Sequence, residues 1–177
     1  MKTIQFYVLT VFACISLLSC GGSGERKTEP ANSTTKPEIK STEPQVTSSA
    51  APLSQEVVLE GNDQMKFNTT EFRVKAGDPI HLTLKHVGTM KKDVMGHNVV
   101  VLKKGSDLNA FATEAIKAKS TDYIPASLNN EIIAHTKLLG GGDSDAITFT
   151  LEEPGTYEFL CSFPGHSAFM KGKIIAE

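Results

Sequence analysis

The sequence predicts an all-β domain, a Greek-key β-sandwich with one inserted helix, from two kinds of observation. The first is a set of short segments in which apolar and polar residues alternate, as at Ile80, Leu82 and Leu84. The second is the turn signals between these segments, such as Gly-Asp-Pro at 77–79 and Glu-Pro-Gly at 153–155. Many short alternating strands separated by turns are typical of β-sandwiches.

The predicted elements follow the chain in order. One convincing helix is expected over 106–119, where Ser106 or Asp107 can cap the first turn. Its apolar stripe is made of Leu108, Phe111, Ala115 and Ile116. The strands are expected at 56–60, 71–75, 80–85, 97–103, 132–137, 146–151, 156–161 and 171–176.

The first residues predict an export signal. Lys2 gives a basic start, and 7–18 is an apolar run too short to span a bilayer comfortably. The run ends at Leu-Leu-Ser-Cys20, which resembles the bacterial lipobox, in which the cysteine becomes the acylated first residue of the mature protein. We therefore expect a lipoprotein signal peptide at 1–19 and a lipid on Cys20. The alternative is a secreted protein that is cut after Ser19 and keeps an ordinary Cys20.

Composition divides the remaining chain into two parts. Residues 20–53 are rich in Ser, Thr, Glu, Lys and Pro, which predicts a lipid-anchored, disordered linker. Residues 54–177 carry the strand pattern and form the predicted domain. The whole chain has a formal net charge of −2, and its domain has no basic run, so nucleic acid is not an expected partner.

A ten-residue segment, Cys161-Ser-Phe-Pro-Gly-His166-Ser-Ala-Phe-Met170, predicts a metal site. A thiolate, an imidazole and a thioether on one short loop are the ligand types that select copper in electron-transfer sites, where two His and a Cys are joined by a distant Met. The best candidate for the second imidazole is His97. Because Cys14 leaves with the signal peptide and Cys20 is acylated, Cys161 has no disulfide partner, which favours a ligand role.

Four segments carry a family resemblance. The stretches 61–68, 94–98, 133–140 and 161–172 resemble the azurins, blue copper proteins of the cupredoxin superfamily, in the same order. The resemblance implies one type 1 copper ion held by His97, Cys161 and His166. It also implies a weak axial Met170 and the Gly96 carbonyl on the opposite side. Asn98, which matches the residue that pins the two ligand segments together, and Phe163 are expected around the ligands.

Two departures from the azurin pattern do not touch the ligands. Val99 stands where azurins commonly have a buried Trp, and the azurin N-terminal disulfide has no cysteines here. The missing disulfide is expected to cost about 2–4 kcal/mol relative to a domain that has it.

The azurin-like arrangement also implies a docking face around the exposed edge of His166, which is expected to be the electron port. The alternative is that the apolar residues of this face are ordinary core or single exposed side chains. The expected partners are redox proteins, c-type cytochromes or copper or haem reductases, that dock transiently. The face consists of Met65, Met90, Val94, Met95, Phe163, Pro164 and Ala168.

The expected function is single-electron transfer at the bacterial cell envelope, in the periplasm or at the outer membrane. No acid–base dyad or Ser/His/Asp arrangement is evident, so neither an enzyme nor a small-molecule substrate is expected. A periplasmic copper-handling protein and an adhesion module are the alternatives. Among the other histidines, His86 is expected to be structural, and His81 and His135 to be solvated.

Overall fold

The computed structural model describes residues 52–177. The predicted signal peptide, Cys20 and nearly all of the predicted linker lie outside the described residues. Within 52–177, no helix combines the length and the apolar character needed to cross a bilayer.

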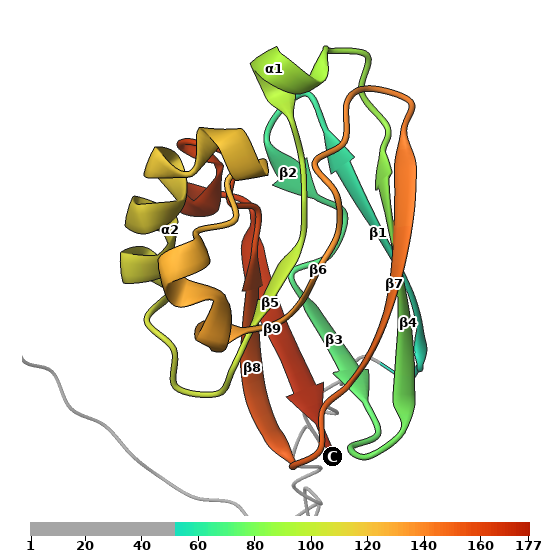
Figure 1. Cartoon of the computed structure of the whole chain (residues 1–177). Coiled ribbons are helices and arrows are strands. Elements are labelled where there is room, and N and C mark those ends of the chain that lie inside the picture. The colour runs from blue at the N-terminus through green and yellow to red at the C-terminus, as the bar shows by residue number, and fades with distance from the viewer. Residues whose placement is uncertain (1–51) are drawn as a thin grey trace, which may run out of the picture. The chain divides into compact units, whose positions relative to one another are not determined.

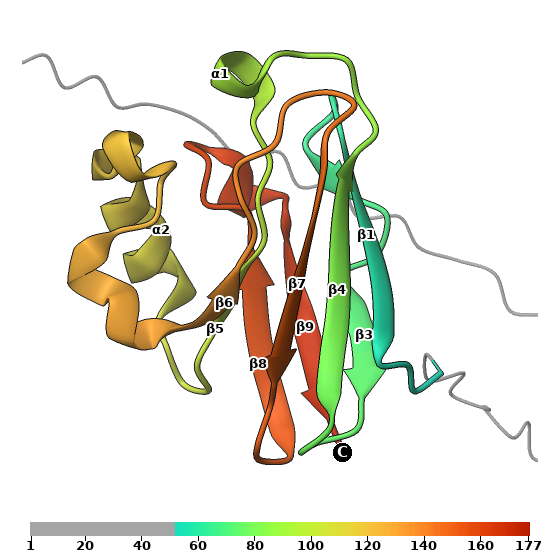
Figure 2. The same ribbon diagram turned by 45° about the vertical axis from the view of Figure 1, so that its right-hand side comes forward.

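Two sheets pack face to face, as Figures 1 and 2 show. The 4-stranded sheet has the order β2 (Lys66–Phe67), β1 (Glu56–Asn62), β4 (Pro79–His86) and β7 (Ser144–Thr150). The 5-stranded sheet has the order β3 (Glu71–Val74), β9 (Lys171–Ala176), β8 (Gly155–Leu160), β5 (Val100–Leu102) and β6 (Ile132–His135). The β1 and β4 strands pair in parallel, as do β3 and β9, and every other strand pair in the sheets is antiparallel.

The core lies between the sheets and follows the alternation seen in the sequence. In β4, Ile80, Leu82 and Leu84 are fully buried, whereas the residues between them are exposed or half-buried. From the other sheet, Phe159 and Ile174 are equally buried. Each such side chain contributes about 1.5–3 kcal/mol by leaving water, so the two apolar faces hold the sandwich together.

The inserted helix is α2 (Leu108–Lys117), and its cap is Asp107. The Asp107 carboxylate accepts hydrogen bonds from the amides of Asn109 and Ala110 and satisfies the free donors of the first turn. Leu108, Phe111 and Ala115 are buried as predicted, but the prediction for Ile116 was wrong because its side chain is 54% exposed. Two 3₁₀ turns, η1 (Lys119–Thr121) and η2 (Ala126–Glu131), lead from α2 to β6.

The connections that carry the site residues gather at one end of the sandwich. The short helix α1 (Lys92–Met95) lies at the end opposite the C-terminus in Figure 1. The 3₁₀ turn η3 (His166–Ala168) connects β8 to β9. The strand predicted from residue 97 starts only at Val100, since His97 leaves the β5–β8 ladder and forms an isolated bridge to Leu139.

The N-terminal edge of the domain is held without a disulfide. Cys161 is the free cysteine of the described residues, and it is buried. Leu53 forms a parallel bridge to Arg73, and the Ser54 amide donates to the Arg73 carbonyl at 3.0 Å. The Arg73 guanidinium also pairs with the Glu177 carboxylate. Val99, the second departure from the azurin pattern, is fully buried and fills its core position with a side chain smaller than Trp.

Candidate metal centre

Hydrogen bonds hold His97 at its backbone amide, at its backbone carbonyl and at one ring nitrogen. Its amide donates to the Leu139 carbonyl at 3.1 Å, and the Leu139 amide donates back at 2.8 Å. The ring Nε2 lies 2.9 Å from the Asn62 carbonyl oxygen, which can only accept, so Nε2 carries the proton. The other nitrogen, Nδ1, therefore has a free lone pair, and it is buried without a hydrogen-bond partner.

The second ligand-bearing segment is the loop from β8 to β9. The Cys161 amide donates to the Met170 carbonyl at 2.9 Å and closes the loop at its base. Gly165 has φ +82°, a left-handed conformation that suits glycine. Directly after it, the His166 carbonyl accepts from the amides of Phe169 and Met170, at 2.9 and 2.7 Å. These bonds hold the loop in one shape and direct His166 inward.

The two segments bring three ligand atoms to one point. Ligand atoms of His97, Cys161 and His166 all lie within 4.8 Å of one another, and all three side chains are buried. The Cys161 Sγ is 3.6 Å from the His166 Nδ1 and 3.8 Å from the Gly96 carbonyl oxygen.

Met170 and His97 meet beside Gly61. A side-chain carbon at Gly61 would lie 2.8 Å from the His97 Cδ2 and 3.3 Å from the Met170 Cε. Met170 is fully buried. The thioether side chain is thus held in the same buried region as the imidazole of His97.

Burial sets the protonation of the site in the absence of a cation. Desolvation raises the pKa of the Cys161 thiol to about 11. Desolvation first, and then the nearby His97 and His86, lower the pKa of His166 to about 4. Desolvation also lowers the pKa of His97. At neutral pH both imidazoles are therefore neutral and able to bind a cation, which has only the thiol proton to displace.

The donor set fits a copper ion. One thiolate, two imidazole nitrogens and a thioether are the soft and borderline ligands of an electron-transfer copper site. The unpartnered Nδ1 of His97 is the kind of buried polar atom that native proteins rarely leave without a partner. A metal ion at this point would satisfy it.

Asn98 joins the two ligand segments. Its Nδ2 donates to the Ser162 Oγ at 2.8 Å, and its Oδ1 accepts from the Ser162 amide at 2.8 Å. Both residues are buried. In the sequence, Asn98 directly follows His97 and Ser162 directly follows Cys161. The reciprocal pair therefore fixes the distance between the two segments.

The remaining histidines lie where their sequence contexts predict. His86 is buried and stacks on His97 with ring centroids 4.2 Å apart. Its Nε2 donates to the Met95 carbonyl at 2.7 Å, and its Nδ1 accepts from the Gly88 amide at 3.1 Å. Both ring nitrogens are satisfied, so His86 is a structural residue that supports His97. His81 and His135 are exposed.

Side chains of the predicted docking face differ in exposure. Val94 is 57% and Met90 42% exposed, and Ala168 is also exposed. Met65, Met95 and Pro164 are half-buried. Phe163 is buried, so it supports the surface more than it forms it. His166 itself is only 3% exposed.

The predicted docking face did not include Phe169, although its side chain is 67% exposed within the ligand loop. Its position next to the buried Met170 is the signal that could have predicted this exposure. Gly61, Asn62 and Tyr123 were also missed, because their contacts with the site come from segments distant in the sequence.

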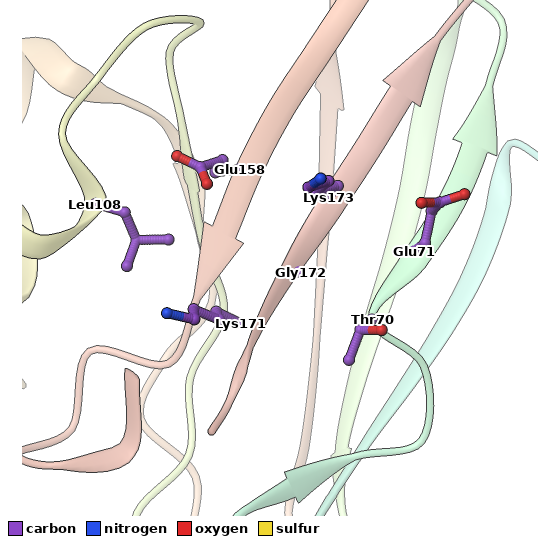
Figure 3. Close-up of a pocket in the computed structure, with 7 residues that line it drawn as sticks. All are labelled: Thr70, Glu71, Leu108, Glu158, Lys171, Gly172 and Lys173. Atoms are coloured by element: carbon purple, nitrogen blue, oxygen red, sulfur yellow. The ribbon is translucent and has the colours of Figure 1, made fainter. Parts of the chain in front are cut away.

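A separate groove of about 330 Å³ lies on the 5-stranded sheet (Figure 3). In the strand register, Lys173 stands opposite Glu71 on one side and Glu158 on the other. Neighbouring side chains of opposite charge thus occupy the groove, and it has no excess of either sign. It is lined by Thr70, Glu71, Leu108, Glu158, Lys171, Gly172 and Lys173.

Comparison with known proteins assigns the domain. Residues 54–177 match the family model described as copper binding proteins, plastocyanin/azurin family. The chain belongs to this family. Azurin of Alcaligenes faecalis is 48% identical over 124 residues, which cover 67% of this chain and 95% of that protein. Outer membrane protein H.8 of Neisseria gonorrhoeae is 41% identical over 119 residues, which cover 66% of this chain and 64% of that protein.

A solved structure confirms the predicted fold of this azurin-family chain. The crystal structure of Na-dithionite reduced auracyanin from the photosynthetic bacterium Roseiflexus castenholzii has a TM-score of 0.64 and 38% sequence identity. The similarity covers 71% of this chain and 99% of that one. Family membership and the His-Cys-His cluster identify a type 1 copper electron-transfer protein, which is not an enzyme.

Proposed function

We propose that one copper ion is held by the Nδ1 atoms of His97 and His166 and the Sγ of Cys161. Met170 and the Gly96 carbonyl would be the weaker ligands. The observation that carries this assignment is the convergence of three buried ligand atoms within 4.8 Å, one of them an unpartnered Nδ1. The bound ion supplies the Cu(I)/Cu(II) couple.

The chain keeps the ligands in one arrangement for both oxidation states. His97 is held by the Asn62 carbonyl and the stacked ring of His86. The thiolate segment is tied to the histidine segment through Asn98. Such supporting contacts fix ligand orientation and tune the potential, so little rearrangement is needed when the electron arrives or leaves.

Electrons enter and leave through His166. It lies on the ligand loop among Pro164, Ala168 and Phe163, close to the protein surface. The exposed Val94 and Met90 support an apolar docking face, because methionine and valine there offer contact area without charge. Redox proteins such as c-type cytochromes or copper or haem reductases are the proposed partners, bound transiently.

The protein works at the bacterial cell envelope, anchored by a lipid on Cys20. The signal peptide covers 1–19, the linker 20–53 and the copper domain 54–177. The similarity to outer membrane protein H.8 supports an envelope location, and the start of the family match at residue 54 supports the domain boundary. Fractionation of cells expressing the full chain tests the anchor: Cys20→Ser should move the protein from the membrane to the soluble fraction.

A titration of the domain with Cu(II) tests the copper function. We expect an intense thiolate-to-copper absorption band that saturates at one ion per chain, is bleached by ascorbate and returns on reoxidation. A colourless copper complex that a chelator removes quickly would instead support copper storage or delivery.

A further inference from the structure

Two consecutive residues with left-handed backbone follow the 3₁₀ turn η1. Asp122 has φ 52° and Tyr123 has φ 65°. Asp adopts this conformation with some frequency, but for a bulky residue such as Tyr it is an outlier. Such strained residues persist where the surroundings determine them, and they gather at functional sites.

The backbone conformation directs the Tyr123 side chain toward the ligand loop. The rings of Tyr123 and Phe163 meet edge to face, at a centroid distance of 5.1 Å and an interplanar angle of 70°. The Phe163 ring lies 4.6 Å from the His166 ring. Tyr123 and Phe163 are both 9% exposed, so the three rings form a buried series that ends at the site.

Phe163 also closes the other side of the site. A side-chain carbon at Gly96 would lie 3.0 Å from the Phe163 Cδ2. The ring therefore packs directly on the backbone that presents the Gly96 carbonyl toward Cys161. Its position determines the space around both the carbonyl and the His166 ring.

Asp122 contacts the histidine segment. Its carbonyl accepts from the Asn98 Nδ2 at 3.5 Å, and its carboxylate lies 3.4 Å from the Lys92 Nζ at the start of α1. The same two strained residues thus touch the segment leading to His97 and the loop that carries His166.

We propose that Tyr123 is a positioning residue for electron transfer. It holds the Phe163 ring between His166 and the Gly96 backbone and so fixes the apolar surroundings of the copper ligands. The inference depends on the proposed ligand set. Since the apolar shell of a metal site controls solvent access and redox potential, moving this ring changes the spectrum and the potential of the site.

Two substitutions of Tyr123 in the copper-loaded domain test the role. Tyr123→Asn keeps a residue that tolerates left-handed backbone but removes the ring. Without the contact between the two rings, the population of molecules in which the Phe163 ring keeps its position, relative to those in which it has moved, falls by about two- to tenfold. We expect a broadened thiolate-to-copper band and a shifted reduction potential. Tyr123→Phe keeps the ring and should restore the wild-type spectrum and potential.

Leu108→Ala is the matched control. Leu108 is buried on α2, in the segment between β5 and β6 that also contains Tyr123. It should lower the melting temperature and leave the spectrum and the potential unchanged. If it shifts them as much as Tyr123→Asn does, or if Tyr123→Asn leaves both unchanged, Tyr123 has only a structural role and the inference is overturned.

A second arm covers the case in which Tyr123→Asn does not fold. Phe163→Leu removes the positioned ring itself and should shift the potential in the same direction; an unchanged potential overturns the inference. A wild-type domain without the blue band would contradict the ligand assignment itself. A blue wild type that Tyr123→Asn and Phe163→Leu leave unaltered would contradict only the role of Tyr123.

Discussion

The backbone of Gly61 lies directly against the imidazole of His97. A side-chain carbon at Gly61 would come within 2.8 Å of the His97 Cδ2, closer than van der Waals contact allows. The ring cannot move away freely, because the Asn62 carbonyl holds its Nε2 and His86 stacks on its face. The closeness of β1 to the ring is therefore part of how the site is built.

Gly61→Ala should disturb the metal site through this contact. Overpacking by one carbon costs about 1–3 kcal/mol, and we expect it to displace the His97 ring, weaken copper binding and change the absorption and EPR spectra. Gly105→Ala is the control, because its φ of +86° makes a side chain unfavourable while nothing lies near the added carbon. The control should lose stability and keep the wild-type spectrum. A wild-type spectrum in Gly61→Ala would contradict the tight packing.

Asn98→Ala should loosen the two ligand segments. The substitution leaves the buried Ser162 amide and hydroxyl without their partner, and each buried group left unsatisfied costs about 1–3 kcal/mol. Denaturant unfolding of the metal-free domain measures the loss, and the potential of the copper form should shift as well. Asn130→Ala, at an exposed position, should change neither quantity. Equal unfolding free energies for the two variants would rule out a fastening role for Asn98.

Metal binding should release one proton. Because burial holds the pKa of Cys161 at about 11 and that of His166 at about 4, the thiol is protonated and the imidazole neutral near neutral pH. Zinc is a redox-inert probe that suits the same ligands. Its affinity should rise about tenfold per pH unit between about pH 6 and pH 8, as one displaced proton requires. Calorimetry in buffers of different ionisation enthalpy checks the count, and release of two protons would mean that an imidazole is charged.

Val94→Lys should slow electron self-exchange. The Val94 side chain is 57% exposed on the proposed docking face, and a lysine there places two like charges against each other when two copies meet. Like-charge contacts cost several kcal/mol, so we expect at least about a tenfold slower rate by NMR line broadening. Val58→Lys is the control, since Val58 is 49% exposed on β1. If both substitutions slow exchange equally, the site of contact is not this face.

The strand pattern could be predicted from the sequence because the core is two-sided and regular. Alternation at Ile80, Leu82 and Leu84 identified a strand whose inner face is buried as expected. The helix was found from its cap and stripe, but Ile116 was misassigned, since the stripe at the end of α2 is narrower than the apolar residues suggest. Strand ends were less predictable: His97 lies just before the apolar run 99–102, but it stays outside the ladder and faces the site.

The candidate site was predictable where its residues share a short loop. The spacing of Cys161, His166 and Met170 in the sequence predicts a metal site. The structure brings His97 close to Cys161 and His166. Tyr123 could not be predicted in this way, because its contact with Phe163 depends on a left-handed backbone that a tyrosine rarely adopts. Gly61 escaped for a similar reason: its closeness to His97 is a property of the packed sandwich.

The central claim is that side chains from two segments meet at one copper ion. The most direct measurement is the anomalous diffraction of crystals of the copper-loaded domain, recorded at the copper absorption edge. We predict a single anomalous peak at bonding distance from the Cys161 Sγ and from the Nδ1 atoms of His97 and His166, with the Met170 sulfur farther away. A peak elsewhere on the domain, or one that leaves the His97 Nδ1 without a bond, would contradict the account.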